Sequence, residues 1–194
     1  MPLDAMKDIS DDALLVLFAN GDRAAARALT LRLTPRVLAH AQRLLGNAAE
    51  AEDVAQEAML RLWKVAPDWR QGDAKVTTWL YRVVANLCTD RLRKARPLPL
   101  DAAPEPLDTA QGADAALQGA ARVDALQKAL VRLPRRQRQA VVLSHLEDLG
   151  NPEIAGIMEI SVEAVESLLT RGRRALAVEL AGRRAELGFA DEHE

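Results

Sequence analysis

The segment from residue 77 to 96 places aromatic rings at its start and positive charges at its end. Trp79 and Tyr81 supply the rings. The positive charges are Arg91, Arg93, Lys94 and Arg96. Aromatic faces stack on unpaired bases and cationic groups attract phosphates, so this combination suits single-stranded or partly opened nucleic acid. An ordinary helix is the alternative, with the rings in a core and the cations exposed at a C-terminus that the helix dipole favours.

A helix must position these groups, and the spacing of the apolar residues in 77–96 predicts one. At about 3.6 residues per turn, the residues that can face a core fall largely on one side. They are Leu80, Val83, Val84, Leu87 and Leu92. The other side is then free to bind a ligand.

The composition predicts an all-α fold. Of the 194 residues, 49% are hydrophobic, and most of these are Ala, Leu and Val in helical spacing. The net charge is −2, so any contact with nucleic acid must come from the way the charges are distributed. Cys88 is the single cysteine, which excludes an internal disulfide and a cysteine-based zinc site and fits a reducing compartment.

The sequence also bears on location. The first ten residues, MPLDAMKDIS, lack the basic and apolar regions of a secretion signal. No stretch of about 18 apolar residues occurs. We therefore expect a cytoplasmic protein with no membrane contact of its own.

The charges divide the chain into two domains. Residues 97–121 contain no Lys or Arg, but they contain four acidic residues and four prolines. This pattern predicts an extended acidic linker between one small helical domain at 10–96 and a second at 122–182. Such a linker can be a simple spacer, or it can occupy a positively charged channel built for nucleic acid.

Two further helices are predicted in the first domain. Asp22 can begin a helix that ends at Gly46, and Pro35 is expected to kink or interrupt it. Asn47 can cap the next helix, whose predicted buried stripe is Ala51, Val54, Ala55, Ala58, Met59 and Leu62. The other face is mostly acidic and polar: Glu50, Glu52, Asp53, Gln56, Glu57 and Arg61. These acids complement the helix dipole, and they could equally dock on a basic partner.

The spacing of small and apolar residues in 151–176 predicts a helix-turn-helix. Ala155, Val165 and Leu168 stand where two helices cross closely in that motif, and Ser161 can cap the second helix. The second helix would then present Glu163, Glu166, Ser167, Thr170, Arg171 and Arg174 outward.

An ordinary helical hairpin is the alternative for 151–176. Glu159 stands where the tight turn usually has glycine.

Catalytic and metal-binding patterns are missing from the sequence. The three histidines have no metal-ligand spacing, and neither a glycine-rich phosphate loop nor a nucleophile elbow occurs. We therefore expect no enzyme activity, no metal and no cofactor. A conventional helix-turn-helix activator or repressor that binds duplex operator DNA is one interpretation, and a helical adaptor that binds only proteins is another.

Three blocks in order, 51–63, 78–96 and 130–176, resemble the extracytoplasmic-function (group IV) sigma factors of bacterial RNA polymerase, in the sigma-70 family. The resemblance implies a region 2-like domain at 10–96 and a region 4-like domain at 122–182. It implies a protein that binds core RNA polymerase and promoter DNA, directs transcription initiation, and responds to a stress or environmental signal under an anti-sigma factor.

The resemblance also implies roles for particular residues. The polymerase-binding residues would be Asp53, Gln56, Glu57 and Leu60. The residues at the −10 element would be Trp79, Asn86, Asp90, Arg91, Arg93 and Lys94, with Asn86 and Asp90 at the base-reading positions. The residues at the −35 element would be Glu166, Ser167, Thr170, Arg171 and Arg174. The linker would thread the RNA exit channel.

Glu166 and Leu168 occupy positions that commonly carry Lys or Arg in this family. Phosphate attraction should be weaker as a result. A glutamate can accept a hydrogen bond from cytosine N4, and an apolar side chain can meet a thymine methyl, so the two residues could alter sequence preference instead of abolishing binding. The sequence does not choose between these two outcomes.

Overall fold

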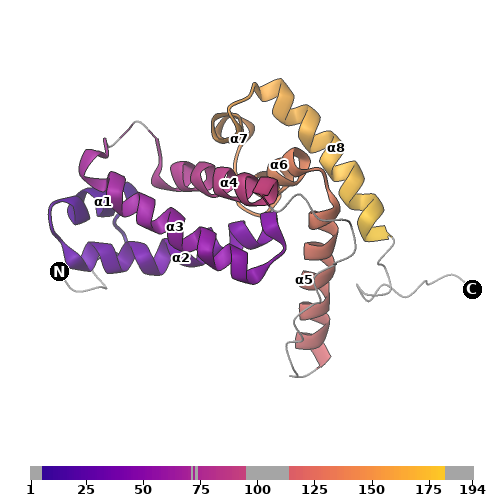
Figure 1. The fold of residues 1–194 in the computed structure, drawn as a ribbon, viewed down its shortest axis with the longest axis horizontal. Helices are drawn as coiled ribbons and strands as arrows, with labels where there is room; N and C mark the ends of the chain where they lie inside the picture. Colours follow the sequence, from indigo (N-terminus) through magenta and orange to yellow (C-terminus); the bar gives the residue numbers. More distant parts are fainter. Residues whose placement is uncertain (1–5, 71, 73, 95–113, 182–194) are drawn as a thin grey trace, which may run out of the picture. The chain divides into compact units, whose positions relative to one another are not determined.

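The computed structural model describes residues 6–70, 72, 74–94 and 114–181, and the regular elements of these residues are all helices (Figure 1). The chain divides into two compact units whose main boundary lies between Arg96 and Pro97. The predicted all-α class is therefore confirmed for the described residues.

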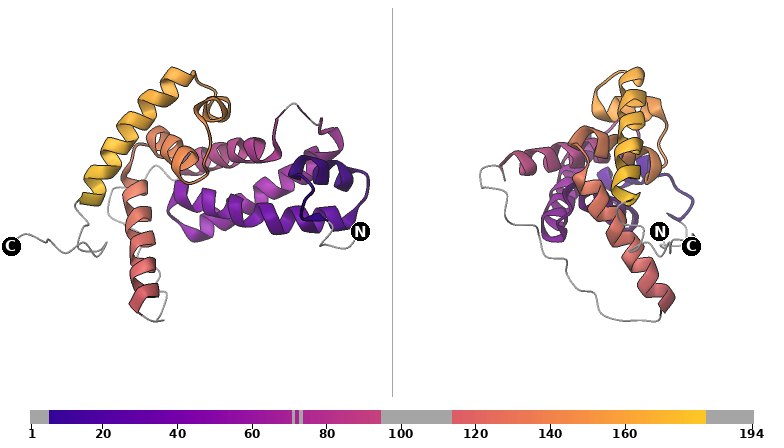
Figure 2. Two further views of the ribbon diagram at one scale, coloured as in Figure 1. Left: turned by 180° about the vertical axis from the view of Figure 1, so that it is seen from behind. Right: turned by 90° about the vertical axis from the view of Figure 1, so that its right-hand side faces the viewer.

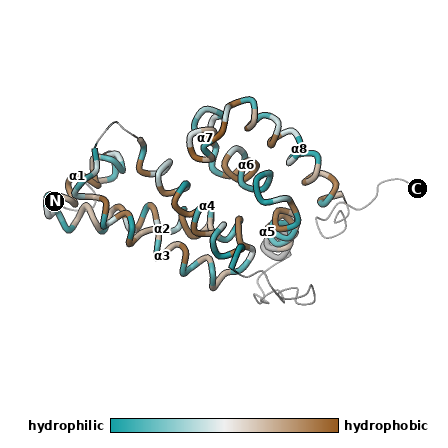
Figure 3. Tube along the Cα trace, turned by 45° about the horizontal axis from the view of Figure 1, so that its top comes forward, coloured by the Kyte–Doolittle hydropathy of each residue, from teal (hydrophilic) through white to brown (hydrophobic). Residues whose placement is uncertain are grey.

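The first unit contains four α-helices and one short 3-10 helix. These are α1 (Asp11–Ala19), α2 (Arg23–Leu45), α3 (Ala48–Val65), η2 (Ala66–Asp68) and α4 (Val76–Lys94). Helices α2, α3 and α4 pack against one another, and α1 packs on α2 and η2 (Figure 2). Hydrophobic and hydrophilic positions alternate along these helices, as amphipathic packing requires (Figure 3).

Side-chain caps begin the helices where the sequence predicts them. The Asp22 carboxylate accepts hydrogen bonds from the amides of Ala24 and Ala25 at 2.8 and 3.2 Å. The Asn47 side-chain oxygen accepts one from the Glu50 amide at 3.0 Å. Each bond satisfies an amide that has no partner within its own helix.

Helix α2 runs through Pro35 to a left-handed Gly46, so the expected interruption does not occur. Pro35 lacks the amide that would bond to the carbonyl of Leu31. Both residues are exposed, and Leu31 is 62% accessible, so water can bond to that carbonyl instead.

The remaining described helices are α5 (Asp114–Arg132), α6 (Arg135–His145), α7 (Asn151–Met158) and α8 (Val162–Ala181). Residues 114–121, expected to be linker, therefore form the start of α5. The reason is that the last proline of the segment is Pro106, while 113–121 is rich in alanine, the strongest helix former. The rest of the predicted linker, 97–113, lies outside the described residues.

A short turn joins α7 to α8. Glu159 adopts a left-handed backbone with φ 54°, and the Ile160 amide donates to the Ala155 carbonyl at 3.1 Å. The Ser161 hydroxyl caps α8 by accepting from the Ala164 amide at 3.2 Å. The turn thus forms with glutamate in a conformation that glycine adopts more easily, at a cost of about 1–2 kcal/mol.

Two buried contacts hold α6 in place. The Arg138 guanidinium, 6% exposed, donates to the carbonyls of Val131 and Leu133 at the end of α5. On the other side, α8 approaches α6 closely at Gly172.

We predict that Gly172→Ala lowers the free energy of unfolding by about 1–3 kcal/mol. A Cβ added there would lie 2.7 Å from Val141 Cγ2 and 3.2 Å from the Gln137 carbonyl oxygen, so α6 and α8 would have to separate. Urea denaturation measures the change. Gly156→Ala is the matched control, because a Cβ at that helical position meets nothing within 4 Å. Equal stability of the two variants would contradict the prediction.

Candidate nucleic-acid and partner interfaces

Four side chains form one outward face of α3. Asp53, Gln56, Glu57 and Leu60 follow the i, i+3, i+4, i+7 spacing that aligns residues along a helix. The predicted stripe that runs from Ala51 to Leu62 is buried as expected, which turns these four toward solvent. Asp53 is 65% exposed, and Leu60 leaves 47% of an apolar side chain in water. We call these four residues the α3 face.

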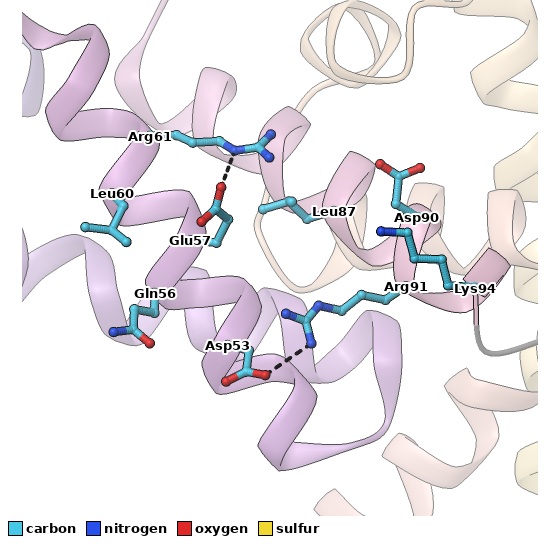
Figure 4. Close-up of a pocket in the computed structure, with 9 residues that line it drawn as sticks. All are labelled: Asp53, Gln56, Glu57, Leu60, Arg61, Leu87, Asp90, Arg91 and Lys94. Carbon is cyan, nitrogen blue, oxygen red and sulfur yellow. Dashed lines mark hydrogen bonds and ion pairs between the residues drawn. The ribbon is translucent and has the colours of Figure 1, made fainter.

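Helix α4 borders the α3 face across a shallow pocket of about 420 Å³. Figure 4 shows the side chains from α4 that line it. They are Leu87, Asp90, Arg91 and Lys94. The pocket therefore joins the predicted polymerase-binding residues to part of the predicted −10 set, a juxtaposition that the sequence did not predict.

Ion pairs cross and flank this pocket (Figure 4). Arg91 Nη1 lies 3.2 Å from Asp53 Oδ2, which links α4 to the α3 face. Arg61 Nε lies 2.9 Å from Glu57 Oε1 within α3. Exposed pairs of this kind contribute about 0–1 kcal/mol each, so their charged groups can exchange partners at low cost.

The predicted −10 residues occupy two faces of α4. Trp79, Asn86, Asp90 and Arg93 follow a helical stripe, and Asn86, Asp90 and Arg93 are exposed along it. Arg93 pairs with Asp90 at 3.0 Å. The other two, Arg91 and Lys94, lie on the neighbouring face beside α3.

The two aromatic residues that begin α4 have different environments. Tyr81 is 5% exposed and lies beside the buried His40, with ring centroids 4.7 Å apart, so it belongs to the core. Trp79 is partly buried and contacts Trp69 edge to face at a centroid distance of 6.1 Å. The alternative of a core aromatic is therefore correct for Tyr81 and partly correct for Trp79.

An apolar groove of about 330 Å³ extends from the α3 face toward α2. Its lining includes Leu38 of α2 with Met59, Leu60 and Trp63 of α3. The role of Leu38 and Trp63 in lining a surface groove was not predicted. Trp63 follows Leu60 by three residues, and this helical spacing could have indicated that the two share a face.

The five predicted −35 residues of α8 are all exposed. They are Glu166, Ser167, Thr170, Arg171 and Arg174. Leu168 is only 9% exposed and faces the core with Val165 and Gly172. Leu168 therefore packs at the helix crossing, as its spacing with Ala155 and Val165 predicts, and the alternative in which it meets a thymine methyl does not fit its burial.

The start of α8 is anionic. A hydrogen bond from the backbone at Glu163, followed by one from the Ser161 hydroxyl, lowers the pKa of the Glu163 carboxyl. Glu163 therefore stays ionised where the helix dipole favours negative charge.

Within the part of the chain that the structure describes, no helix has the length and apolar composition needed to cross a bilayer. Among the same residues, no group of three or more His, Cys, Asp and Glu side chains is placed to hold a metal ion.

Comparisons with known proteins give the family. Residues 29–97 match Sigma-70 region 2, and residues 124–176 match Sigma-70, region 4. The chain is 38% identical over 149 residues to the ECF RNA polymerase sigma factor SigW of Bacillus subtilis, covering 71% of this chain and 79% of that protein. It is 37% identical over 170 residues to the ECF RNA polymerase sigma factor SigM of Mycobacterium tuberculosis, covering 87% and 83%.

A solved structure shows the same fold. CnrH in complex with the cytosolic domain of CnrY superposes with a TM-score of 0.65 and 27% identity, covering 89% of this chain and 97% of that one. Because both sigma-70 regions match in order and the relatives exceed 30% identity over most of their length, the chain belongs to the ECF sigma factors of the sigma-70 family, and it directs transcription initiation.

Proposed function

We propose that this sigma factor binds core RNA polymerase through the α3 face, opens the −10 element with α4 and reads the −35 element with α8. The observation that carries the proposal is the pocket in which the α3 face meets the cationic end of α4. One compact unit thus presents a surface for a protein and a surface for DNA side by side.

The α3 face suits a basic helical partner. Asp53 and Glu57 supply exposed carboxylates, which steer a positively charged surface and fix its register. Leu60 supplies an apolar contact at the edge of the groove that includes Met59 and Trp63. A polar rim next to an apolar anchor is the usual anatomy of a protein interface.

The outer face of α4 suits opened DNA. Asn86 and Asp90 offer hydrogen-bonding groups to base edges, and Arg93 continues the same stripe with a charge for phosphate. The Trp69–Trp79 contact puts aromatic surface at the start of the helix, where an unpaired base can stack.

The exposed residues of α8 suit the major groove. Helices α7 and α8 are joined by a short turn, and the second helix of such a motif enters the groove by its N-terminal half. Glu166, Ser167 and Thr170 would meet base edges there, and Arg171 and Arg174 would meet phosphates or guanine.

We further propose that the helix-turn-helix domain is joined to the first domain by an extended segment within 97–113, whose acidic residues favour a positively charged channel of the polymerase. An anti-sigma factor is the expected regulator, since the similar CnrH was solved with the cytosolic domain of CnrY. A protein that acts by binding RNA polymerase would be located in the cytoplasm.

Reversing two charges of the α3 face tests the polymerase contact. We predict that Asp53→Lys combined with Glu57→Lys weakens binding to core RNA polymerase at least about tenfold, because both carboxylates would face a basic partner. Helix content should not change, since both side chains are substantially exposed. A fluorescence binding titration measures the affinity.

Asp8→Lys combined with Asp68→Lys is the charge-matched control, because both residues are exposed in the same unit away from the α3 face. Wild-type affinity of the α3-face variant would refute the assignment.

Removing two cations of α4 tests the DNA contact. We predict that the holoenzyme with Arg91→Ala and Arg93→Ala opens promoters less completely and binds single-stranded −10 DNA with a weaker salt dependence. Each lost phosphate contact removes about 0.7 from the slope of log affinity against log salt. Arg23→Ala with Arg27→Ala removes the same charge from an exposed part of α2 and should leave the slope unchanged. Identical slopes for the two double variants would show that α4 does not contact phosphates.

Substitutions of Glu166 test the proposed contact with the −35 element. If Glu166 accepts from a cytosine amino group, Glu166→Lys and Glu166→Ala should both change the preferred upstream element at one base pair, with about 1–3 kcal/mol of discrimination at stake. Selection of promoters by holoenzyme at two salt concentrations measures the preference. If Glu166→Lys strengthens binding to all sequences and leaves the motif unchanged, Glu166 is a bystander and does not read a base.

A further inference from the structure

The N-cap residue of α4 cannot cap the helix with its own side chain. The Trp79 amide donates to the Lys75 carbonyl at 3.1 Å, which makes Lys75 the N-cap residue. A lysine side chain carries donors only, so it cannot accept from the first amides of the helix. The amide of Val76, the first helical residue, must find its acceptor elsewhere.

Asp12 of α1 supplies that acceptor. Its Oδ1 accepts from the Val76 amide at 3.0 Å, although the two residues are 64 positions apart. Val76 is fully buried, so water cannot replace the bond easily. A carboxylate at this place also complements the dipole of α4.

The neighbouring carboxylate has a different task. Asp11 pairs with Arg32 of α2 at 3.3 Å, and the same guanidinium donates to the carbonyls of Lys7 and Ile9 at 2.8 and 2.7 Å. Asp11 and Arg32 therefore fasten the N-terminal segment to α2. Of the two acids, only Asp12 links α1 to α4.

A second contact reaches the start of α4 from the same region of the fold. Trp69, which directly follows η2, contacts Trp79 in the first turn of α4, and η2 packs on α1. The start of α4 is thus held by the aromatic contact at Trp79 and by the Asp12 cap at Val76.

We propose that Asp12 is a positioning residue for capture of the opened −10 strand, acting through the Val76 amide on the first turn of α4. The inference rests on the proposed role of α4 at the −10 element. Asp12 itself needs no contact with DNA. Its bond reduces the number of orientations that the first turn of α4 and Trp79 can adopt before a base arrives.

The test uses the full chain assembled with core RNA polymerase. The probe is a fluorescein-labelled single strand that carries the −10 element of a promoter enriched by the wild-type holoenzyme. We expect Asp12→Ala to weaken capture of this strand about fivefold, the typical effect of losing a helix cap. Affinity for core polymerase should be unchanged, and amide hydrogen exchange should accelerate from Val76 to Trp79.

Two variants separate positioning from general loss of stability. Asp12→Asn keeps an oxygen acceptor and should retain capture within about twofold. Asp11→Ala removes the same charge from the adjacent residue and should retain capture, because Asp11 bonds to Arg32 and not to α4.

A double-mutant cycle tests the bond from the other side. Val76→Pro removes the amide donor, and proline is well tolerated at the first helical position. Asp12→Ala should therefore have no additional effect on capture in the Val76→Pro background.

Three results would overturn the inference. The first is that Asp12→Ala captures the strand as tightly as the wild type, and the second is that it loses affinity for core polymerase by the same factor as it loses capture. The third is that Asp12→Asn loses as much capture as Asp12→Ala. Failure of the wild-type holoenzyme to capture the strand would instead refute the proposed function of α4, and the inference with it. That result is visible before any variant is compared.

Discussion

Burial of one stripe of α3 is the constraint on which the rest of the first unit depends. The stripe combines small residues such as Ala51, Ala55 and Ala58 with Val54 and Leu62, so α2 and α4 can both approach α3 closely. At 3.6 residues per turn, burying these positions leaves no choice about which others face water. The core thereby determines the α3 face, although none of the face residues takes part in the core.

The same packing places charges of opposite sign within reach across the pocket. Arg91 extends from α4 to Asp53, and the pair is exposed enough to contribute at most about 1 kcal/mol. If Asp53 binds a polymerase helix or Arg91 binds a phosphate, as we propose, breaking the pair therefore costs little. The exposed ion pair orients both side chains and leaves each of them able to change partner.

Features that depend on local chemistry could be predicted from the sequence. Asp22, Asn47 and Ser161 cap helices within three residues of themselves, and the apolar period of α3 identified both its buried and its exposed positions. Features that depend on distant segments could not.

Several such features involve residues that no local pattern relates. The Asp12–Val76 bond joins residues far apart in sequence, Tyr81 packs beside His40 of α2, and Gly172 is required by the approach of α6. A helix-turn-helix alone also fits a conventional activator or repressor, so it does not specify the family. The order of the sigma-70 regions specifies it and confirms the predicted sigma factor.

The charge of α8 bears on how the protein meets promoter DNA. Glu163 and Glu166 lie among the exposed residues with Arg171, Arg173 and Arg174, so two acids offset most of the charge of three cations, and the buried Leu168 adds no charge. Non-specific attraction to phosphates grows with the excess of cations, which is small in this set of residues. We infer that α8 contributes discrimination between sequences more than affinity, and that most of the affinity comes from the polymerase, which holds the helix near its site at a high effective concentration.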